Sequence, residues 1–103
     1  MASENTYILT AKIALYPTTE GGRKKPVYSG YRPSFAFNTS RHYSGEIQLL
    51  GREILYPGES TTVTIKLLPA RTIRKTLKKN DAFTITEVNK VIGAGVIENA
   101  VLN

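Results

Sequence analysis

The sequence has no cysteine, no tryptophan and a single histidine among its 103 residues. Without cysteine, the chain can form neither a disulfide nor a thiolate nucleophile or metal ligand. The lone His42 stands in "SRHYSG" and is interpreted as a solvated loop residue. The acidic residues do not follow any metal-ligand spacing around it; they include Glu46, Glu53, Glu59, Asp81 and Glu87. We therefore expect no metal site.

Long apolar runs are also absent, because none approaches the roughly 20 residues that a membrane-spanning helix needs. The opening stretch "MASENTYILT" has neither a basic leader nor an apolar core suited to export. Together these absences predict a cytoplasmic protein with no membrane partner.

Nucleotide-binding and hydrolytic motifs are missing as well. A phosphate-binding loop needs G-x-x-x-x-G-K-[ST], and "GGRKKPVYS" has glycines and cations at the wrong spacing. The "GAG" of Gly93–Gly95 lacks the third glycine of a dinucleotide fingerprint, so its glycines are expected to relieve crowding between strands. Ser40 and Ser44 flank His42 without a nucleophile motif. We expect a non-enzymatic protein without a cofactor.

An alternation of apolar and polar residues runs through most of the chain. It predicts strands in "YILTAKIALY", "FAF", "EIQLL", "VTIKL", "AFTIT" and "KVIGAGVI". The resulting fold class is all-β, a small closed antiparallel β-barrel of about six strands in one domain, residues 1–103. Residues 1–10 are left open as an N-terminal extension. The expected core comprises Leu15, Phe35, Phe37, Ile47, Val63, Ile65, Phe83, Ile85 and Val91.

Short polar or glycine-containing pairs mark the expected turns between these strands. They are Gly21-Gly22, Ser44-Gly45, Pro57-Gly58, Asn80-Asp81 and Val88-Asn89. "RTIRKTLKKN", from Arg71 to Asn80, does not alternate, so either a helical turn or a basic loop is expected. We interpret residues 70–80 as a basic insertion.

Positive charge is in excess, with 14 Lys and Arg against 8 Asp and Glu and a net charge of +6. Such an excess attracts nucleic-acid backbones or other anionic surfaces. The cations gather in two clusters. The first is Arg23, Lys24 and Lys25, and the second is Arg71, Arg74, Lys75, Lys78 and Lys79. If both clusters lie at one end of the barrel, they would form a single electropositive surface.

Four segments occur in the order and spacing typical of one family. "EGGR", "GYRPSFAF", "YPGES" and "VIGAGVI" resemble segments of the third, C-terminal domain of translation elongation factor Tu, and the resemblance covers about residues 11–98. The resemblance implies a small antiparallel barrel without the GTPase domain, occurring here as a stand-alone domain. In that family the domain helps to hold tRNA and also packs against other domains and the exchange factor.

The resemblance also assigns roles to particular residues. Arg23 matches a tRNA-facing arginine and Ser44 a threonine whose hydroxyl faces the RNA, while Arg32 belongs to the retained G-Y-R-P. Ser34 stands where the family has glutamine, which shortens that contact. Val88 and Asn89 replace two glycines, and a branched valine disfavours the positive φ of such a turn. The second basic cluster replaces a shorter, acidic segment.

Two functions remain open. One is a module that binds tRNA or other structured RNA through the candidate residues Arg23, Lys24, Lys25, Arg32, Ser44, Arg71, Arg74, Lys75, Lys78 and Lys79. The other is a protein-interaction or self-associating barrel that has lost tRNA binding. This second function would use apolar and aromatic surface left uncovered by absent neighbours, including Tyr28, Tyr31, Tyr43 and Tyr56.

Overall fold

The computed structural model describes residues 6–37, 41–67 and 77–102, and the regular secondary structure of this part is almost entirely β-strand. The strands are β1 (Tyr7–Leu15), β2 (Val27–Tyr28), β3 (Ser34–Ala36), β4 (Tyr43–Leu49), β5 (Ile54–Leu55), β6 (Ser60–Leu67), β7 (Ala82–Glu87) and β8 (Lys90–Leu102). One short 3₁₀ helix, η1 (Thr18–Glu20), follows β1. None of the described helices is long and apolar enough to cross a membrane.

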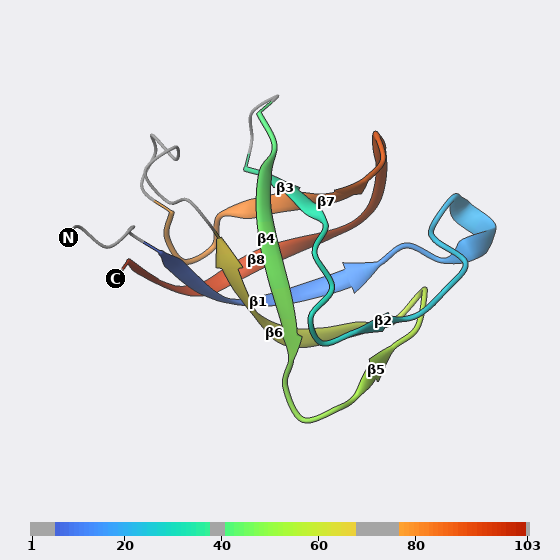
Figure 1. Ribbon diagram of the computed structural model, residues 1–103, viewed down its shortest axis with the longest axis horizontal. Coiled ribbons are helices and arrows are strands. Elements are labelled where there is room, and N and C mark those ends of the chain that lie inside the picture. Colours follow the sequence, from blue (N-terminus) through green and yellow to red (C-terminus); the bar gives the residue numbers. More distant parts are fainter. Residues whose placement is uncertain (1–5, 38–40, 68–76, 103) are drawn as a thin grey trace.

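Six of the described strands form a closed barrel in the order β1-β6-β4-β3-β7-β8, and every neighbouring pair is antiparallel. The predicted barrel is therefore confirmed. The two short strands β2 and β5 pair with each other beside it. Figure 1 shows that η1 and the turn between β7 and β8 lie at one end of the molecule, while the last residues of β8 lie at the other.

The barrel interior is filled by the apolar residues that alternate along each strand. In β1, Leu9, Ala11, Ile13 and Leu15 are at most 2% exposed. All the predicted core residues are buried except Val91. The prediction for Val91 was wrong, because Val91 is 43% exposed and its neighbour Ile92, at 1% exposed, is buried instead. The cause is a β-bulge. Ile85 pairs with Gly93 but Thr86 pairs with Val91, so Ile92 is an extra residue in β8. This extra residue shifts the alternation, so that the side chain of Ile92 points into the barrel and that of Val91 points outward.

Glycine lets β8 pass close to its neighbours, as the sequence suggested. A Cβ atom on Gly95 would lie 2.4 Å from the ring of Phe83, and one on Gly93 would lie 2.6 Å from the carbonyl oxygen of Ala14. No side chain larger than hydrogen fits at either position without movement of the core or backbone.

The Ser44-Gly45 turn was predicted wrongly, because both residues lie within β4. Ser44 pairs with Ser34 on β3, and Gly45 pairs with Leu67 on β6. A Cβ atom on Gly45 would lie 2.8 Å from the side chains of both Leu67 and Phe35, so this glycine serves close packing inside the barrel. Of the segment Arg71–Asn80, residues 71–76 lie outside the described residues.

Candidate nucleic-acid interface

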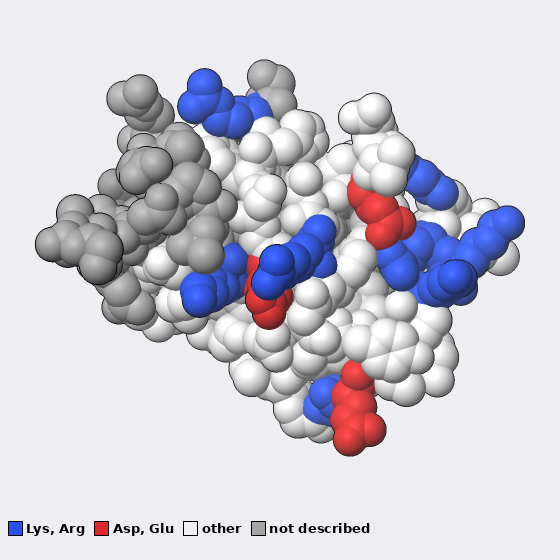
Figure 2. Space-filling model, viewed as in Figure 1, with Lys and Arg blue, Asp and Glu red and all other residues white. Residues whose placement is uncertain are grey.

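One face of the barrel carries two groups of exposed cations. Lys24 and Lys25 are exposed in the loop between η1 and β2, while Arg32 before β3 and Lys66 on β6 are exposed over the barrel wall. In Figure 2 the cations gather over the end that carries η1 and over the middle of the face near β4 and β6. This face therefore brings together residues from both halves of the chain.

Arg23 is held by the fold and does not extend freely into solvent. Its side chain is 16% exposed and forms an ion pair with Glu87, the last residue of β7. Its Nη1 donates a hydrogen bond of 3.0 Å to the hydroxyl of Tyr31, and its guanidinium lies 4.7 Å from the centre of the Tyr31 ring. Arg23 thus ties the loop after η1 to the β7–β8 hairpin.

The same guanidinium also orders its own loop. Nε donates to the carbonyl oxygen of Lys25 at 2.7 Å, and Nη2 donates to that of Pro26 at 3.4 Å. The hydroxyl of Thr18 in η1 donates to the carbonyl oxygen of Arg23 at 2.8 Å. These contacts fix the backbone on which Lys24 and Lys25 stand, and within the described residues neither lysine has an ion-pair partner.

Tyr31 completes this cluster as both donor and acceptor. Its hydroxyl donates to the same Glu87 oxygen, Oε2, that pairs with Arg23. Burial of the ring, followed by the hydrogen bond to Glu87, raises the pKa of Tyr31 above its ordinary value, and the neighbouring Arg23 only partly opposes this. Tyr31 therefore remains a neutral donor at physiological pH.

A second group of candidate residues lies over the barrel wall. Arg32, Ser44, Gly45, Glu46 and Lys66 line a hollow of about 170 Å³. Arg32 and Glu46 form an exposed ion pair of 3.4 Å, and Glu46 is the cross-strand partner of Lys66. The structure therefore brings together Arg32 and Ser44, which the sequence proposed, and adds Lys66, which it missed. The outward position of Lys66 in the alternation of "VTIKL" was the available signal.

The second basic cluster does not share an end with the first, as far as the structure describes it. Lys78 and Lys79 precede the start of β7, and Lys78 forms an ion pair of 3.4 Å with Asp81. Glu87, which holds Arg23, ends the same strand, roughly 20 Å away at the usual rise per residue. Arg71, Arg74 and Lys75 lie outside the described residues. Lys78 and Lys79 therefore do not form a single surface with the first cluster, Arg23, Lys24 and Lys25.

The departures from the family pattern have clear structural consequences. Val88 and Asn89 form the β7–β8 turn with φ angles of 47° and 63°, and the Val88 side chain is 91% exposed. The valine adopts a positive φ despite its branching, because Glu87 and Lys90 pair across a two-residue turn that requires it. Ser34 is half-buried on β3 opposite Ser44.

The aromatic residues proposed for protein contacts separate into two classes. Tyr28 and Tyr56 are 56% and 51% exposed beside the paired strands β2 and β5. Tyr31 and Tyr43 instead pack against the core as partly buried residues. Only Tyr28 and Tyr56 of these four therefore offer a largely open aromatic surface.

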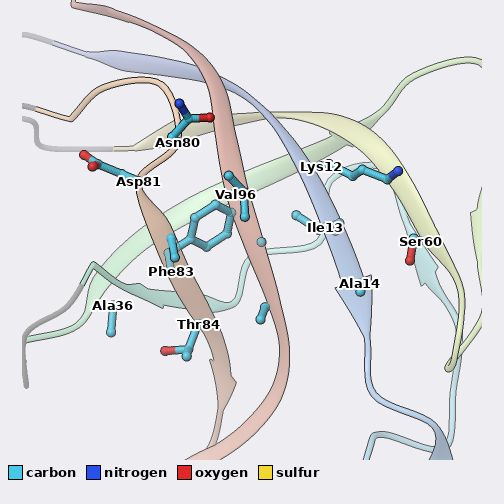
Figure 3. A pocket seen from close by; sticks show the side chains of 13 residues that line it. Lys12, Ile13, Ala14, Ala36, Ser60, Asn80, Asp81, Phe83, Thr84 and Val96 are labelled. Atoms are coloured by element: carbon cyan, nitrogen blue, oxygen red, sulfur yellow. The ribbon is translucent and has the colours of Figure 1, made fainter.

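A larger hollow of about 980 Å³ crosses the outer wall from β3 to β6. Its floor follows a register row of small side chains across five strands: Ala36, Thr84, Ala94, Ala14 and Ser60. Figure 3 shows Lys12 of β1 and Asp81, which directly precedes β7, at its borders. In the described part of the chain, no group of three or more histidine, aspartate or glutamate side chains is placed to hold a metal ion.

Comparison with known families adds one finding. The family model described as the elongation factor Tu C-terminal domain matches residues 3–101, which is nearly the whole chain. The match includes the E-G-G-R loop, the G-Y-R-P segment and the closing β8 strand.

Proposed function

Because this chain belongs to the elongation factor Tu C-terminal domain family, we propose that it is a non-enzymatic module that binds structured RNA, with tRNA as the first candidate. The family is one of translation factors, and its barrel domain is non-catalytic. A cytoplasmic location and a role in translation accord with this proposal.

The observation that carries the proposal is the pair Lys24 and Lys25, exposed on an ordered loop without ion-pair partners among the described residues. Arg23 donates hydrogen bonds to the carbonyl oxygens of Lys25 and Pro26, so it holds the loop backbone from which the two lysine side chains extend. Lysines of this kind bind phosphates as point charges, which supports binding without sequence preference.

Arg32, Ser44 and Lys66 extend this surface over the barrel wall. Structured RNA is recognised mainly through phosphates and 2′-hydroxyls, and these side chains supply two cations and a hydroxyl for such contacts. Lys78 and Lys79 are proposed as a separate basic region that does not join the Lys24–Lys25 surface. Arg71, Arg74 and Lys75 lie outside the described residues and stay candidates from the sequence alone.

The test is a titration of the protein with tRNA at several salt concentrations. We expect Lys24→Glu/Lys25→Glu to weaken binding and to reduce the log–log salt slope by about 0.7–0.9 for each phosphate that the variant no longer neutralises. Lys12→Glu is the control for the single variants Lys24→Glu and Lys25→Glu, which change the charge equally, because Lys12 is exposed on β1 at the border of the larger hollow. No tRNA binding by the parent protein at low salt, or a loss of affinity in Lys12→Glu equal to that in each of these single variants, would refute the proposal.

A protein-interaction or self-associating barrel is the second candidate function. The exposed Tyr28 and Tyr56 favour it, because aromatic residues are enriched in protein interfaces. Sedimentation over a wide concentration range tests self-association. A parent protein that dimerises, and a Tyr28→Ser/Tyr56→Ser variant that does not, would support this candidate, whereas a monomeric parent would exclude the homodimer.

A further inference from the structure

We infer that the side chains of Arg23 and Tyr31 form a binding site for one oxygen of an anion, here called the oxyanion seat. The Glu87 carboxylate occupies this seat in the free protein, and an RNA phosphate replaces Glu87 on binding. This inference rests on the proposed RNA-binding function and adds a residue that regulates RNA binding at the same surface. Glu87 then acts as an internal competitor of the RNA backbone.

The geometry of the donors is the first support. A single Glu87 oxygen, Oε2, accepts hydrogen bonds both from Nη1 of Arg23 and from the hydroxyl of Tyr31. A phosphate oxygen accepts charge-assisted hydrogen bonds from the same kinds of donor. The carboxylate therefore stands where one oxygen of a bound phosphate would stand.

The seat is organised by contacts that do not involve Glu87. The Arg23 guanidinium is fixed by the carbonyl oxygens of Lys25 and Pro26 and lies over the Tyr31 ring. Tyr31 is in turn anchored by the pairing of its backbone with Ile47. Departure of Glu87 would leave both donors in place, so the incoming anion would meet a preformed site.

Glu87 is the member of the cluster that can leave most readily. Its side chain is 36% exposed, compared with 16% for Arg23, so rotation towards solvent is open to it. It borders the Val88-Asn89 turn, and its cross-strand neighbour Lys90 is exposed. Lys90 can accept the displaced carboxylate as a new partner, which lowers the penalty of exchange.

The exchange has a consequence for selectivity. With Glu87 in the seat, its negative charge offsets that of Arg23, and the exposed cations that the loop after η1 itself offers to anions are Lys24 and Lys25. An RNA phosphate must therefore be held first by the lysines before it can displace Glu87. An isolated anion, without a neighbouring phosphate for the lysines, competes poorly with the tethered carboxylate.

The variant Glu87→Gln tests this inference, because glutamine keeps the size of the side chain and an acceptor for the Tyr31 hydroxyl. We expect several-fold tighter tRNA binding and a log–log salt slope steeper by about 0.7–0.9, as for one additional phosphate contact. Glu59→Gln is the matched control. It removes one negative charge from an acid that is also paired with an arginine, Arg52, and neither residue belongs to the proposed RNA surface.

A second readout needs no RNA. Addition of inorganic phosphate to Glu87→Gln should shift the Nε–H resonance of Arg23 and the ring resonances of Tyr31, and should shift them less in the parent protein. Equal tRNA affinity and slope in Glu87→Gln and Glu59→Gln would overturn the seat while leaving the proposed function intact. If the parent does not bind tRNA, the proposed function fails, and an absence of phosphate-induced shifts in Glu87→Gln would then also refute the seat.

Discussion

Val88 combines two unfavourable properties at a single residue. Its side chain is the most exposed of the large apolar residues that the structure describes, and its backbone has a φ of 47°. A β-branched residue in this region is strained by about 1–3 kcal/mol. Glycine adopts the same conformation without the steric penalty, although it loses more entropy on folding.

Replacement of Val88 by glycine should therefore stabilise the protein by about 1 kcal/mol. The measurement is the free energy of unfolding from chemical denaturation. Asn89→Gly is the control and should change stability less, because asparagine tolerates its φ of 63°. A Val88→Gly variant no more stable than the parent would show that the turn carries little strain.

The sequence indicated that valine disfavours this turn, but it could not show that the strands impose the turn regardless. The sequence also could not predict the ion-pair partner of Arg23, because Glu87 lies 64 positions further along the chain. Such a contact depends on the register between strands, and no local pattern around either residue encodes it. The basic character of the loop was predictable, but the pairing that offsets the charge of Arg23 was not.

Tyr31 links elements at the scale of the loop and the hairpin. Its hydroxyl connects Arg23, after η1, to Glu87 at the end of β7. The raised pKa of Tyr31, caused first by burial and then by Glu87, means that the folded state favours the neutral phenol. The unfolded chain releases that proton near the ordinary tyrosine pKa of about 10.

This difference predicts a loss of stability in alkali. The contribution of Tyr31 is fully present below about pH 10 and declines as the pH rises towards its higher folded-state pKa. The measurement is the free energy of unfolding of the parent and of Tyr31→Phe between about pH 8 and pH 11. We expect the difference between them to change in favour of Tyr31→Phe as the pH rises. Tyr28→Phe is the matched control, and a pH-independent difference for Tyr31→Phe would contradict the prediction.

Most strands were predictable because each buries one face, and a period of two follows directly from that burial. Two of the errors arose where packing departs from this rule, and the two-residue strands β2 and β5 were too short to show an alternation. The bulge at Ile92 moved Val91 outward, and Gly45 took part in close packing where the sequence indicated a turn. Both features depend on neighbouring strands, so the alternation within one strand could not reveal them.

The positions of the charged side chains on the surface are set by the fold of the whole molecule, which measures 45 × 30 × 25 Å. Barrel closure places Lys66 of β6 beside Arg32 and Ser44, although they are distant in sequence. The same closure puts Lys78 and Lys79 at the other end of β7 from Glu87 and Arg23. The sequence showed two basic clusters, and only the strand order determined which cations share a face.

Two double variants of equal charge test whether RNA lies on a single face. Lys25→Glu/Lys66→Glu changes both groups of that face, whereas Lys25→Glu/Lys79→Glu changes one of them together with the opposite end. If RNA covers the face shown in Figure 2, the first variant weakens phosphate binding at two groups of cations and the second weakens it at one.

The salt slope of tRNA binding distinguishes these outcomes. The slope should fall further in Lys25→Glu/Lys66→Glu, by about 0.7–0.9 for each further phosphate left without its cation, and should fall in Lys25→Glu/Lys79→Glu only as far as in Lys25→Glu alone. All three lysines are exposed, so each substitution should alter stability by no more than about 0.5 kcal/mol. Equal slopes in the two double variants would mean that the RNA also contacts the start of β7. The bound RNA would then extend beyond one face to the opposite end of the barrel.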